Sequence, residues 1–176
     1  KLRRASKEPF RYACPQPAVQ DSTTRGDWPG QYGSKGYVFC HYEPDGSHRI
    51  RLPEFTDSIR FAKTGGLHIA TRTDDRRAPV SEDGSGTRNA GTVVTLDPAP
   101  CNQTMTVDIR NKHDGPYRLA LYFVDWEKTG RRSAVEVFDL DDKRLLMPVQ
   151  IVRDYREGRY VVLSLEGSVR LRINQV

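Results

Sequence analysis

The chain has 176 residues, 36% of them hydrophobic and 29% charged, which is typical of one folded domain with a core of its own. Glycine and proline are near their average abundance, so the composition excludes a collagen-like or low-complexity chain. The formal net charge is +5, but residues 1–20 supply four of these five charges. We therefore expect residues 1–20 to be a basic N-terminal arm or linker and residues 21–176 to be a single, nearly neutral domain.

Apolar side chains alternate with a period of two along most of the chain, which predicts strands. In chain order we expect strands at residues 37–42, 67–71, 91–96, 104–111, 117–126, 133–140, 144–152, 160–165 and 169–173. Both alternating faces of residues 117–126 are apolar, which predicts a strand in the middle of a sheet. Glu166, Gly167 and Ser168 separate two strand patterns and predict a hairpin.

No segment has a convincing helical period, so the pattern predicts an all-β fold, specifically an antiparallel β-sandwich of jelly-roll type. The polar, glycine-containing segment at residues 74–89 predicts an exposed, mobile loop. No apolar run approaches the roughly 18 residues of a membrane span, and no nucleic-acid motif is present. We expect neither a membrane span nor a nucleic-acid partner.

Residues 21–37, DSTTRGDWPGQYGSKGY, combine aromatic side chains with glycines and have no strand or helix period. Two roles fit the rings of Trp28, Tyr32 and Tyr37. They could form a platform on which sugar rings stack, or they could fold over one end of the sandwich core and close it. Glycines crowded around an indole indicate a backbone pressed against it, which favours the packed role for Trp28.

Asp125 and Trp126 end a predicted strand and precede Lys128, Arg131 and Arg132. A carboxylate beside guanidinium groups could bind sugar hydroxyls or a uronic acid. It could also pair with Arg131 or Arg132 and hold the turn in place, and the pattern favours this structural role.

Three stretches of the sequence resemble one known family. They are DSTTRGDWPGQYG at 21–33, continuing to Gly36-Tyr37; LYFVDW at 121–126, followed by GRR at 130–132; and GRY at 158–160, leading to GSVR at 167–170. Together they are similar to a β-sandwich accessory module of secreted bacterial polysaccharide-degrading enzymes such as glycosidases. The resemblance implies a galactose-binding-like or jelly-roll fold and an extracellular or periplasmic location, and it does not imply catalysis. The family continues past this point with a further apolar segment, whereas this sequence stops at Val176.

No strong metal, redox or catalytic motif is found. The acidic groups, Asp139, Asp141 and Asp142 in one cluster and Asp74, Asp75, Glu82 and Asp83 in the other, lack EF-hand spacing, so we expect no cofactor, with structural calcium as a weaker alternative. The histidines, His41, His48, His68 and His113, lie far apart in sequence, and His68 is expected to be a core or sheet residue. Cys14, Cys40 and Cys101 have no CxxC spacing, which leaves their pairing open.

These features predict a non-catalytic module that binds a polysaccharide or oligosaccharide weakly, or that supports a neighbouring catalytic domain of the same polypeptide. The expected ligand-binding residues are Trp28, Tyr32, Trp126 and Arg131, with Asp125 as a polar anchor. One alternative is a structural or protein-interaction β-sandwich without a small-molecule site. Another is a small lyase or hydrolase that uses Tyr, His or Arg groups.

Overall fold

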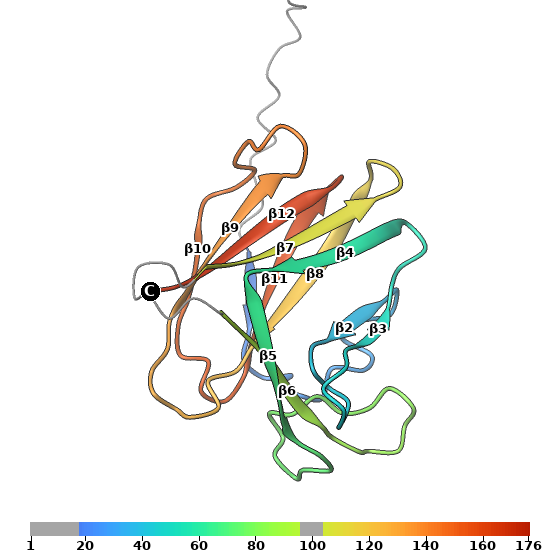
Figure 1. The fold of residues 1–176 in the computed structure, drawn as a ribbon, viewed down its shortest axis with the longest axis vertical. Helices are drawn as coiled ribbons and strands as arrows, with labels where there is room; N and C mark the ends of the chain where they lie inside the picture. Colours follow the sequence, from blue (N-terminus) through green and yellow to red (C-terminus); the bar gives the residue numbers. More distant parts are fainter. Residues whose placement is uncertain (1–17, 96–103) are drawn as a thin grey trace, which may run out of the picture.

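The computed structural model describes residues 18–95 and 104–176, which form strands and connecting turns without a helix (Figure 1). Most of these strands carry an apolar residue at every second position, the pattern of a half-buried sheet. The strands are β1 (Val19–Asp21), β2 (Tyr37–Phe39), β3 (Arg49–Arg51), β4 (Thr56–Ala62), β5 (Thr64–Ala70), β6 (Ala90–Thr95), β7 (Thr104–Asn111), β8 (Pro116–Phe123), β9 (Ser133–Asp139), β10 (Gln150–Val152), β11 (Arg159–Glu166) and β12 (Val169–Gln175).

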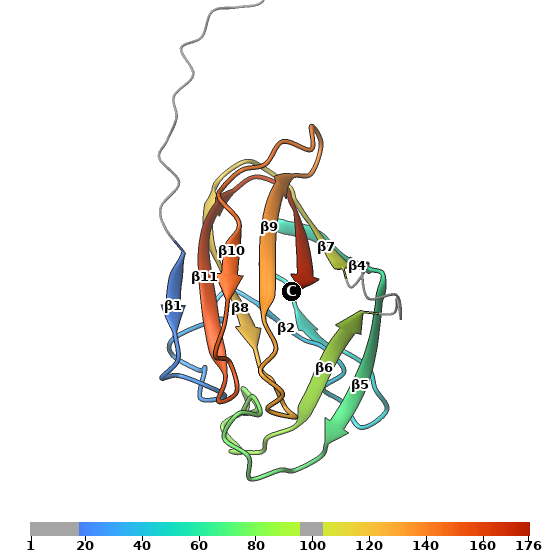
Figure 2. The same cartoon turned by 90° about the vertical axis from the view of Figure 1, so that its left-hand side faces the viewer.

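Two antiparallel sheets form the body of the fold. One sheet has five strands in the order β10-β9-β12-β7-β4, and the other has three strands in the order β1-β11-β8. Figure 2 shows them as two layers, and the two-stranded ribbon of β5 and β6 extends away from them. The predicted antiparallel β-sandwich is confirmed, and its jelly-roll winding stays a prediction.

Apolar residues from facing strands fill the space between the two layers. On β12, Val169 and Leu171 are buried between the sheets, whereas Arg170 and Arg172 alternate onto the outer face, as the sequence predicted. Leu163 of the opposite sheet is fully buried in the same core. Burial of aliphatic side chains in this way contributes roughly 1.5–3 kcal/mol per residue, which makes this layer the main source of stability.

A second apolar cluster lies on the outer face of the three-stranded sheet. Tyr160 and Val162 of β11 and Tyr122 of β8 project there, and the loop that contains Trp28 covers them. Both faces of β8 are thus occupied, as its sequence indicated, but β8 is an edge strand and not a central one. The prediction of a central position was wrong because the second apolar face packs against a loop layer instead of another sheet.

Residues 166–168 do not close a hairpin. β11 pairs with β1 and β8, whereas β12 pairs with β7 and β9 in the other sheet. Gly167 has a positive φ of 68°, and the turn it forms carries the chain from one layer to the other. The hairpin prediction was wrong because the same glycine turn can either join neighbouring strands or cross between two sheets.

The segment at residues 74–89 is more buried than its polarity predicted. Ala78 is fully buried, Ser81 and Asn89 are 5% and 6% exposed, and Val80 packs against the second apolar cluster. Only residues 82–86 are exposed throughout. The prediction of an exposed loop was therefore wrong for most of its length.

Several strand boundaries also differ from the predictions. Of the strand expected at 144–152, only β10 is observed, since Pro148 has no amide hydrogen to donate to a neighbouring strand. The expected strand at 37–42 contracts to β2, and the sequence pattern missed β1, β3 and β4. The basic residues 1–17 lie outside the described residues, and residues 19–21 belong to the sandwich through β1.

Candidate functional site

Trp28 lies in a packed position on the three-stranded sheet. Its side chain is 5% exposed and contacts Tyr160 and Val162. The indole Nε1 donates a hydrogen bond of 2.7 Å to the carbonyl oxygen of Val80, which satisfies the only polar group of the ring. Trp28 therefore closes the second apolar cluster. It covers the outer face of a sheet, not an end of the sandwich, and in this conformation its ring has no open face for a sugar.

Tyr32 is the half-buried end of a stack of three rings. Its centroid lies 4.3 Å from that of Tyr160, which lies 4.4 Å from that of Tyr122. The Tyr32 hydroxyl donates to Asp21 Oδ2 at 2.9 Å. Burial and the adjacent Asp21 carboxylate raise the pKa of Tyr32 to about 12, so the phenol stays neutral.

Asp21 fixes the start of the aromatic loop. Its carboxylate accepts hydrogen bonds from the backbone amides of Thr23 and Thr24, from both threonine hydroxyls and from Tyr32. Burial on its own would raise the pKa of Asp21, but these hydrogen bonds outweigh burial and hold the pKa well below its ordinary value. Asp21 is therefore ionised near neutral pH and holds the turn in one conformation.

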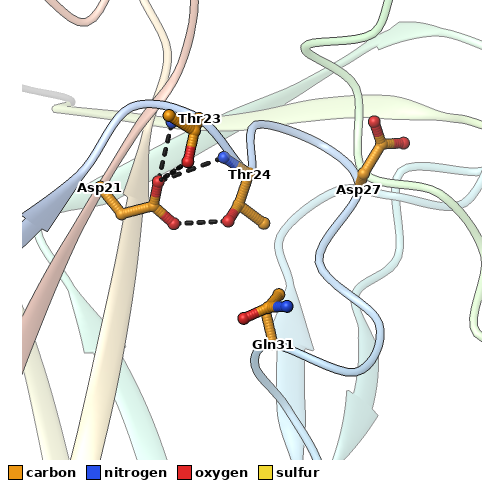
Figure 3. A pocket seen from close by; sticks show the side chains of 5 residues that line it. All are labelled: Asp21, Thr23, Thr24, Asp27 and Gln31. Carbon is orange, nitrogen blue, oxygen red and sulfur yellow. Dashed lines mark hydrogen bonds between the residues drawn. The ribbon is translucent and has the colours of Figure 1, made fainter.

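The loop hollow is an open depression of about 390 Å³ lined by Asp21, Thr23, Thr24, Asp27 and Gln31. Figure 3 shows the Asp21 carboxylate bonded to Thr23 and Thr24, with Gln31 and Asp27 on the other sides of the hollow. Arg76 and Arg88 both pair with the carboxylate of Asp27. Gln31 is exposed, and its side-chain amide carries donor and acceptor atoms, which suits the hydroxyl groups of a sugar.

Asp125 holds the turn between β8 and β9. Its side chain is 1% exposed, and Oδ2 accepts hydrogen bonds from the amides of Gly130 at 2.8 Å and Arg131 at 3.2 Å. Burial raises the pKa of Asp125, but these backbone hydrogen bonds outweigh burial and lower the pKa overall. The Arg131 guanidinium lies 3.9 Å from Asp125 and also pairs with Glu127. Asp125 is thus an internal anchor of the turn, the structural role that the sequence pattern favoured.

Trp126 is half-buried and lies outside both apolar clusters. The Arg77 guanidinium lies over its ring, 4.9 Å from the centroid, in a cation–π contact. Asp75 holds Arg77 through hydrogen bonds from Nε and Nη2, the latter 2.7 Å long, and Arg77 Nη1 donates to the carbonyl oxygen of Arg156 at 3.1 Å. Together with Arg131, these residues form what we call the tryptophan corner: Asp75, Arg77, Trp126 and Arg131.

The predicted site residues thus fall into two groups. Trp28 and Tyr32 belong to the aromatic loop, whereas Asp125, Trp126 and Arg131 belong to the turn after β8. Arg77 connects the groups, since its guanidinium contacts Trp126 and its carbonyl oxygen accepts a 2.9 Å hydrogen bond from Tyr122, in the ring stack that contains Tyr32.

Sequence reasoning missed Arg77 and Tyr160. Arg77 lies 48 residues from Asp125 and 49 from Trp126, and nothing in its local sequence indicates its contacts with them. A signal for Tyr160 was present, because it alternates with the core residue Val161 and therefore faces the outer side of the sheet.

Several of the acidic groups named for calcium are engaged with protein atoms. Asp139 accepts hydrogen bonds from the amides of Asp141 and Asp142, and Asp83 accepts one from the amide of Ser85. Within residues 18–95 and 104–176, no three His, Cys, Asp or Glu side chains are grouped so that they could hold a metal ion.

Three histidines, His41, His48 and His68, lie close together beside β5. The rings of His41 and His48 lie 4.4 Å apart, and His68 Nδ1 lies 3.1 Å from the carbonyl oxygen of His41. His68 is on β5, as expected of a sheet histidine. Burial raises the pKa of the nearby Cys40 thiol to about 12, and Cys14 and Cys101 lie outside the described residues.

Comparison with protein-family models, with curated proteins and with solved structures finds no match for this chain. In the part of the chain that the structure describes, no helix has the length and hydropathy that crossing a membrane requires.

Proposed function

We propose that this domain is a non-catalytic module of a secreted, carbohydrate-active protein. In this proposal its fold is a jelly roll and its location is extracellular or periplasmic. In this proposal it binds a polysaccharide or oligosaccharide weakly at the tryptophan corner, beside a neighbouring catalytic domain of the same polypeptide. The burial of Trp28 and Asp125 supports Trp126 and Arg131 as the ligand-binding residues of this proposal, with Tyr32 and the loop hollow as a second polar contact.

The observation that carries the proposal is the contrast between the two tryptophans. Trp28 is sealed in an apolar cluster, whereas Trp126 is half-buried outside both clusters and has a fixed guanidinium over its ring. A ring held in place by Arg77 and Asp75 loses little conformational freedom when a ligand binds. Its C–H edge and the guanidinium of Arg131, which belongs to the same turn, provide apolar and polar contacts of the kind that sugars need.

The test is calorimetric titration of the domain against a panel of plant and algal polysaccharides. We expect weak, saturable heats with at least one polysaccharide, since one ring and a few hydrogen bonds leave only a small surplus over the free-energy costs of binding. If no polysaccharide produces heat, the binding role is excluded and a supporting role remains.

A second candidate function is a structural or protein-interaction domain. It is favoured by three exposed apolar side chains near the edge strand β10, namely Leu145, Val149 and Ile151, which are 47%, 42% and 41% exposed. Exposed apolar groups gathered at one edge are typical of contacts with another domain. A titration without heat would favour this candidate over glycan binding.

A further inference from the structure

The outer face of the five-stranded sheet carries a second depression, which we call the cationic hollow. It has a volume of about 370 Å³ and is lined by Ser58, Arg60, Asp108, Arg110, Leu140, Asp141, Lys143 and Arg170. Four of these side chains are cationic and two are carboxylates, so the hollow carries a net charge of +2. It lies on the opposite sheet from the aromatic loop.

The floor of the hollow is rigid because its charged groups are set by strand pairing. Asp108 of β7 lies between Arg60 of β4 and Arg170 of β12 in the sheet register. Arg170 Nε donates a 2.7 Å hydrogen bond to Oδ1 of Asp108, and Arg170 Nη2 donates one of 2.7 Å to Oδ2. This two-bond pairing fixes the plane of the guanidinium and leaves its remaining N–H groups available.

The cationic side chains at the walls of the hollow have N–H groups that are available to bind an anion. Exposed Arg60 forms no ion pair with any other residue in 18–95 or 104–176, and Arg110 reaches Asp141 only at 3.5 Å, with 51% of its side chain exposed. Lys143 donates to the carbonyl oxygen of Leu140, which keeps its ammonium group at the rim. A guanidinium presents two parallel N–H groups to a carboxylate or a sulfate, a geometry that a lysine lacks.

From this arrangement we infer that the cationic hollow binds the acid group of a polysaccharide, namely the carboxylate of a uronic acid or the sulfate of a sulfated sugar. The inference rests on the proposed glycan-binding function and specifies the class of glycan. Arg60 and Arg110 bind the acid group, and Ser58, Asp108 and Asp141 accept hydrogen bonds from neighbouring sugar hydroxyls.

The carboxylates decide between a glycan and a nucleic acid. Asp108 and Asp141 would repel the phosphates of a nucleic-acid backbone, since a phosphodiester group offers the hollow only acceptor oxygens and negative charge. A sugar acid offers one anionic group together with hydroxyl donors, and this mixture matches the mixed lining of the hollow. Adjacent strands lie about 4.8 Å apart, so β4, β7 and β12 together span about the length of one or two sugar rings.

The experiment measures dissociation constants of the full chain by fluorescence anisotropy at low ionic strength. The probes are a labelled oligogalacturonate, a labelled sulfated dextran oligomer and a labelled single-stranded oligonucleotide of similar charge. The test variant is Arg60→Gln with Arg110→Gln. The control is Arg118→Gln with Arg153→Gln, which removes the same charge from two exposed arginines outside the hollow and keeps the basic residues 1–20.

We expect the hollow variant to weaken binding of at least one acidic saccharide by about ten-fold or more, and the control to weaken it less than about two-fold. The two saccharide probes show whether the acid is a carboxylate or a sulfate. Ser58→Glu, which places a negative charge in the hollow and keeps both arginines, should weaken binding similarly, and it remains informative if the double variant is unstable.

Three results would overturn the inference: no binding of either acidic saccharide, equal losses in the hollow and control variants, or tighter binding of the oligonucleotide with the same dependence on the hollow. The proposed function is tested separately. If a neutral polysaccharide loses binding on Trp126→Ala but keeps it in the hollow variant, while neither acidic saccharide binds, the tryptophan corner is supported and the inference about the cationic hollow fails. If the acidic saccharides bind through the hollow and no saccharide depends on Trp126, the tryptophan corner fails instead.

Discussion

Gly33 lies directly against the indole of Trp28. A Cβ atom placed on Gly33 would fall 2.5 Å from Cζ3 and 2.9 Å from Cε3 of the ring, and the backbone φ of Gly33 is +71°. Carbon atoms do not approach this closely without displacement, so the loop can cover Trp28 only because residue 33 has no side chain. The aromatic loop and the ring it covers therefore depend on each other.

We predict that Gly33→Ala lowers the free energy of unfolding by about 2–4 kcal/mol, since it adds both a steric overlap and a strained φ. Gly30→Ala is the matched control, because Gly30 also has a positive φ, +82°, but nothing lies within 4 Å of its Cβ position. We expect Gly30→Ala to cost about 1 kcal/mol. Urea unfolding measures both values, and equal costs would show that Gly33 does not press on Trp28.

The two tryptophans should differ in their access to solvent. The chain has only two tryptophans, so Trp126→Phe leaves Trp28 as the single emitter and Trp28→Phe leaves Trp126. We expect acrylamide to quench Trp126 several-fold more strongly than Trp28, because Trp28 is 5% exposed. Equal quenching would contradict the packed position of Trp28 and reopen it as a ligand platform.

The Asp125 carboxylate should be necessary for the turn after β8. We predict that Asp125→Asn lowers the free energy of unfolding by about 1.5–3 kcal/mol, because a neutral amide lacks the negative charge that strengthens the hydrogen bonds from Gly130 and Arg131 and the contact with the Arg131 guanidinium. Asp141→Asn is the control, since the Asp141 side chain is 75% exposed, and we expect a change within about 0.5 kcal/mol. Chemical denaturation of both variants distinguishes these costs.

The lowered pKa of the Asp125 carboxylate predicts that the folded protein loses stability in acid. Its pKa in the folded protein is lower than the ordinary value of 3.8, so the unfolded chain binds the proton first as the pH falls. The stabilisation from ionised Asp125 is therefore present above pH 3.8 and is lost as the pH falls through the lowered pKa. Asp125→Asn should flatten this part of the stability profile, and an unchanged acid slope would show that Asp125 is not responsible for it.

The lowered pKa of His48 predicts a second, separate loss of stability at milder pH. Burial and the adjacent His41 lower its pKa below 6.5, and its Nδ1 accepts a 2.9 Å hydrogen bond from the amide of His41. The unfolded chain gains a proton at His48 first, so stability is fully present above pH 6.5 and decreases as the pH falls below it. Thermal unfolding between pH 8 and pH 5 should show this loss, and His48→Asn, which keeps an acceptor, should reduce it. The same loss in the variant would exclude His48 as its source.

The period-two alternation of apolar residues was sufficient to predict that the fold consists of β-sheets. It was not sufficient to predict which strand belongs to which sheet. β7 was predicted at its observed bounds, since its buried Val107 and Ile109 alternate with polar residues. β4 has the same alternation, with Ile59 and Phe61, but only two inward apolar residues among polar neighbours, which was too little to predict it. The turn at Gly167 was predicted, but which sheet the next strand joins depends on contacts that lie far apart in the sequence.

Part of the candidate site could also be predicted, where neighbouring residues in the sequence determine the role of a side chain. The packed role of Trp28 followed from its glycine neighbours, and the structural role of Asp125 from the arginines after it. The cation over Trp126 could not be predicted, because nothing in the sequence of residues 74–89 singles out Arg77 as the side chain that reaches the ring. The stack of Tyr32, Tyr160 and Tyr122 joins three segments and becomes visible only when the sheet register is known.

Emission from Trp126 tests the central claim most directly. The Trp28→Phe variant, in which Trp126 is the only emitter, is titrated with the polysaccharide that gives the largest heat in calorimetry, and Trp126→Phe is titrated in parallel. If a glycan binds at the tryptophan corner, Trp126 emission changes with the same saturation curve as the heat, while Trp28 emission stays constant. Saturable heat with no change in Trp126 emission would contradict the account.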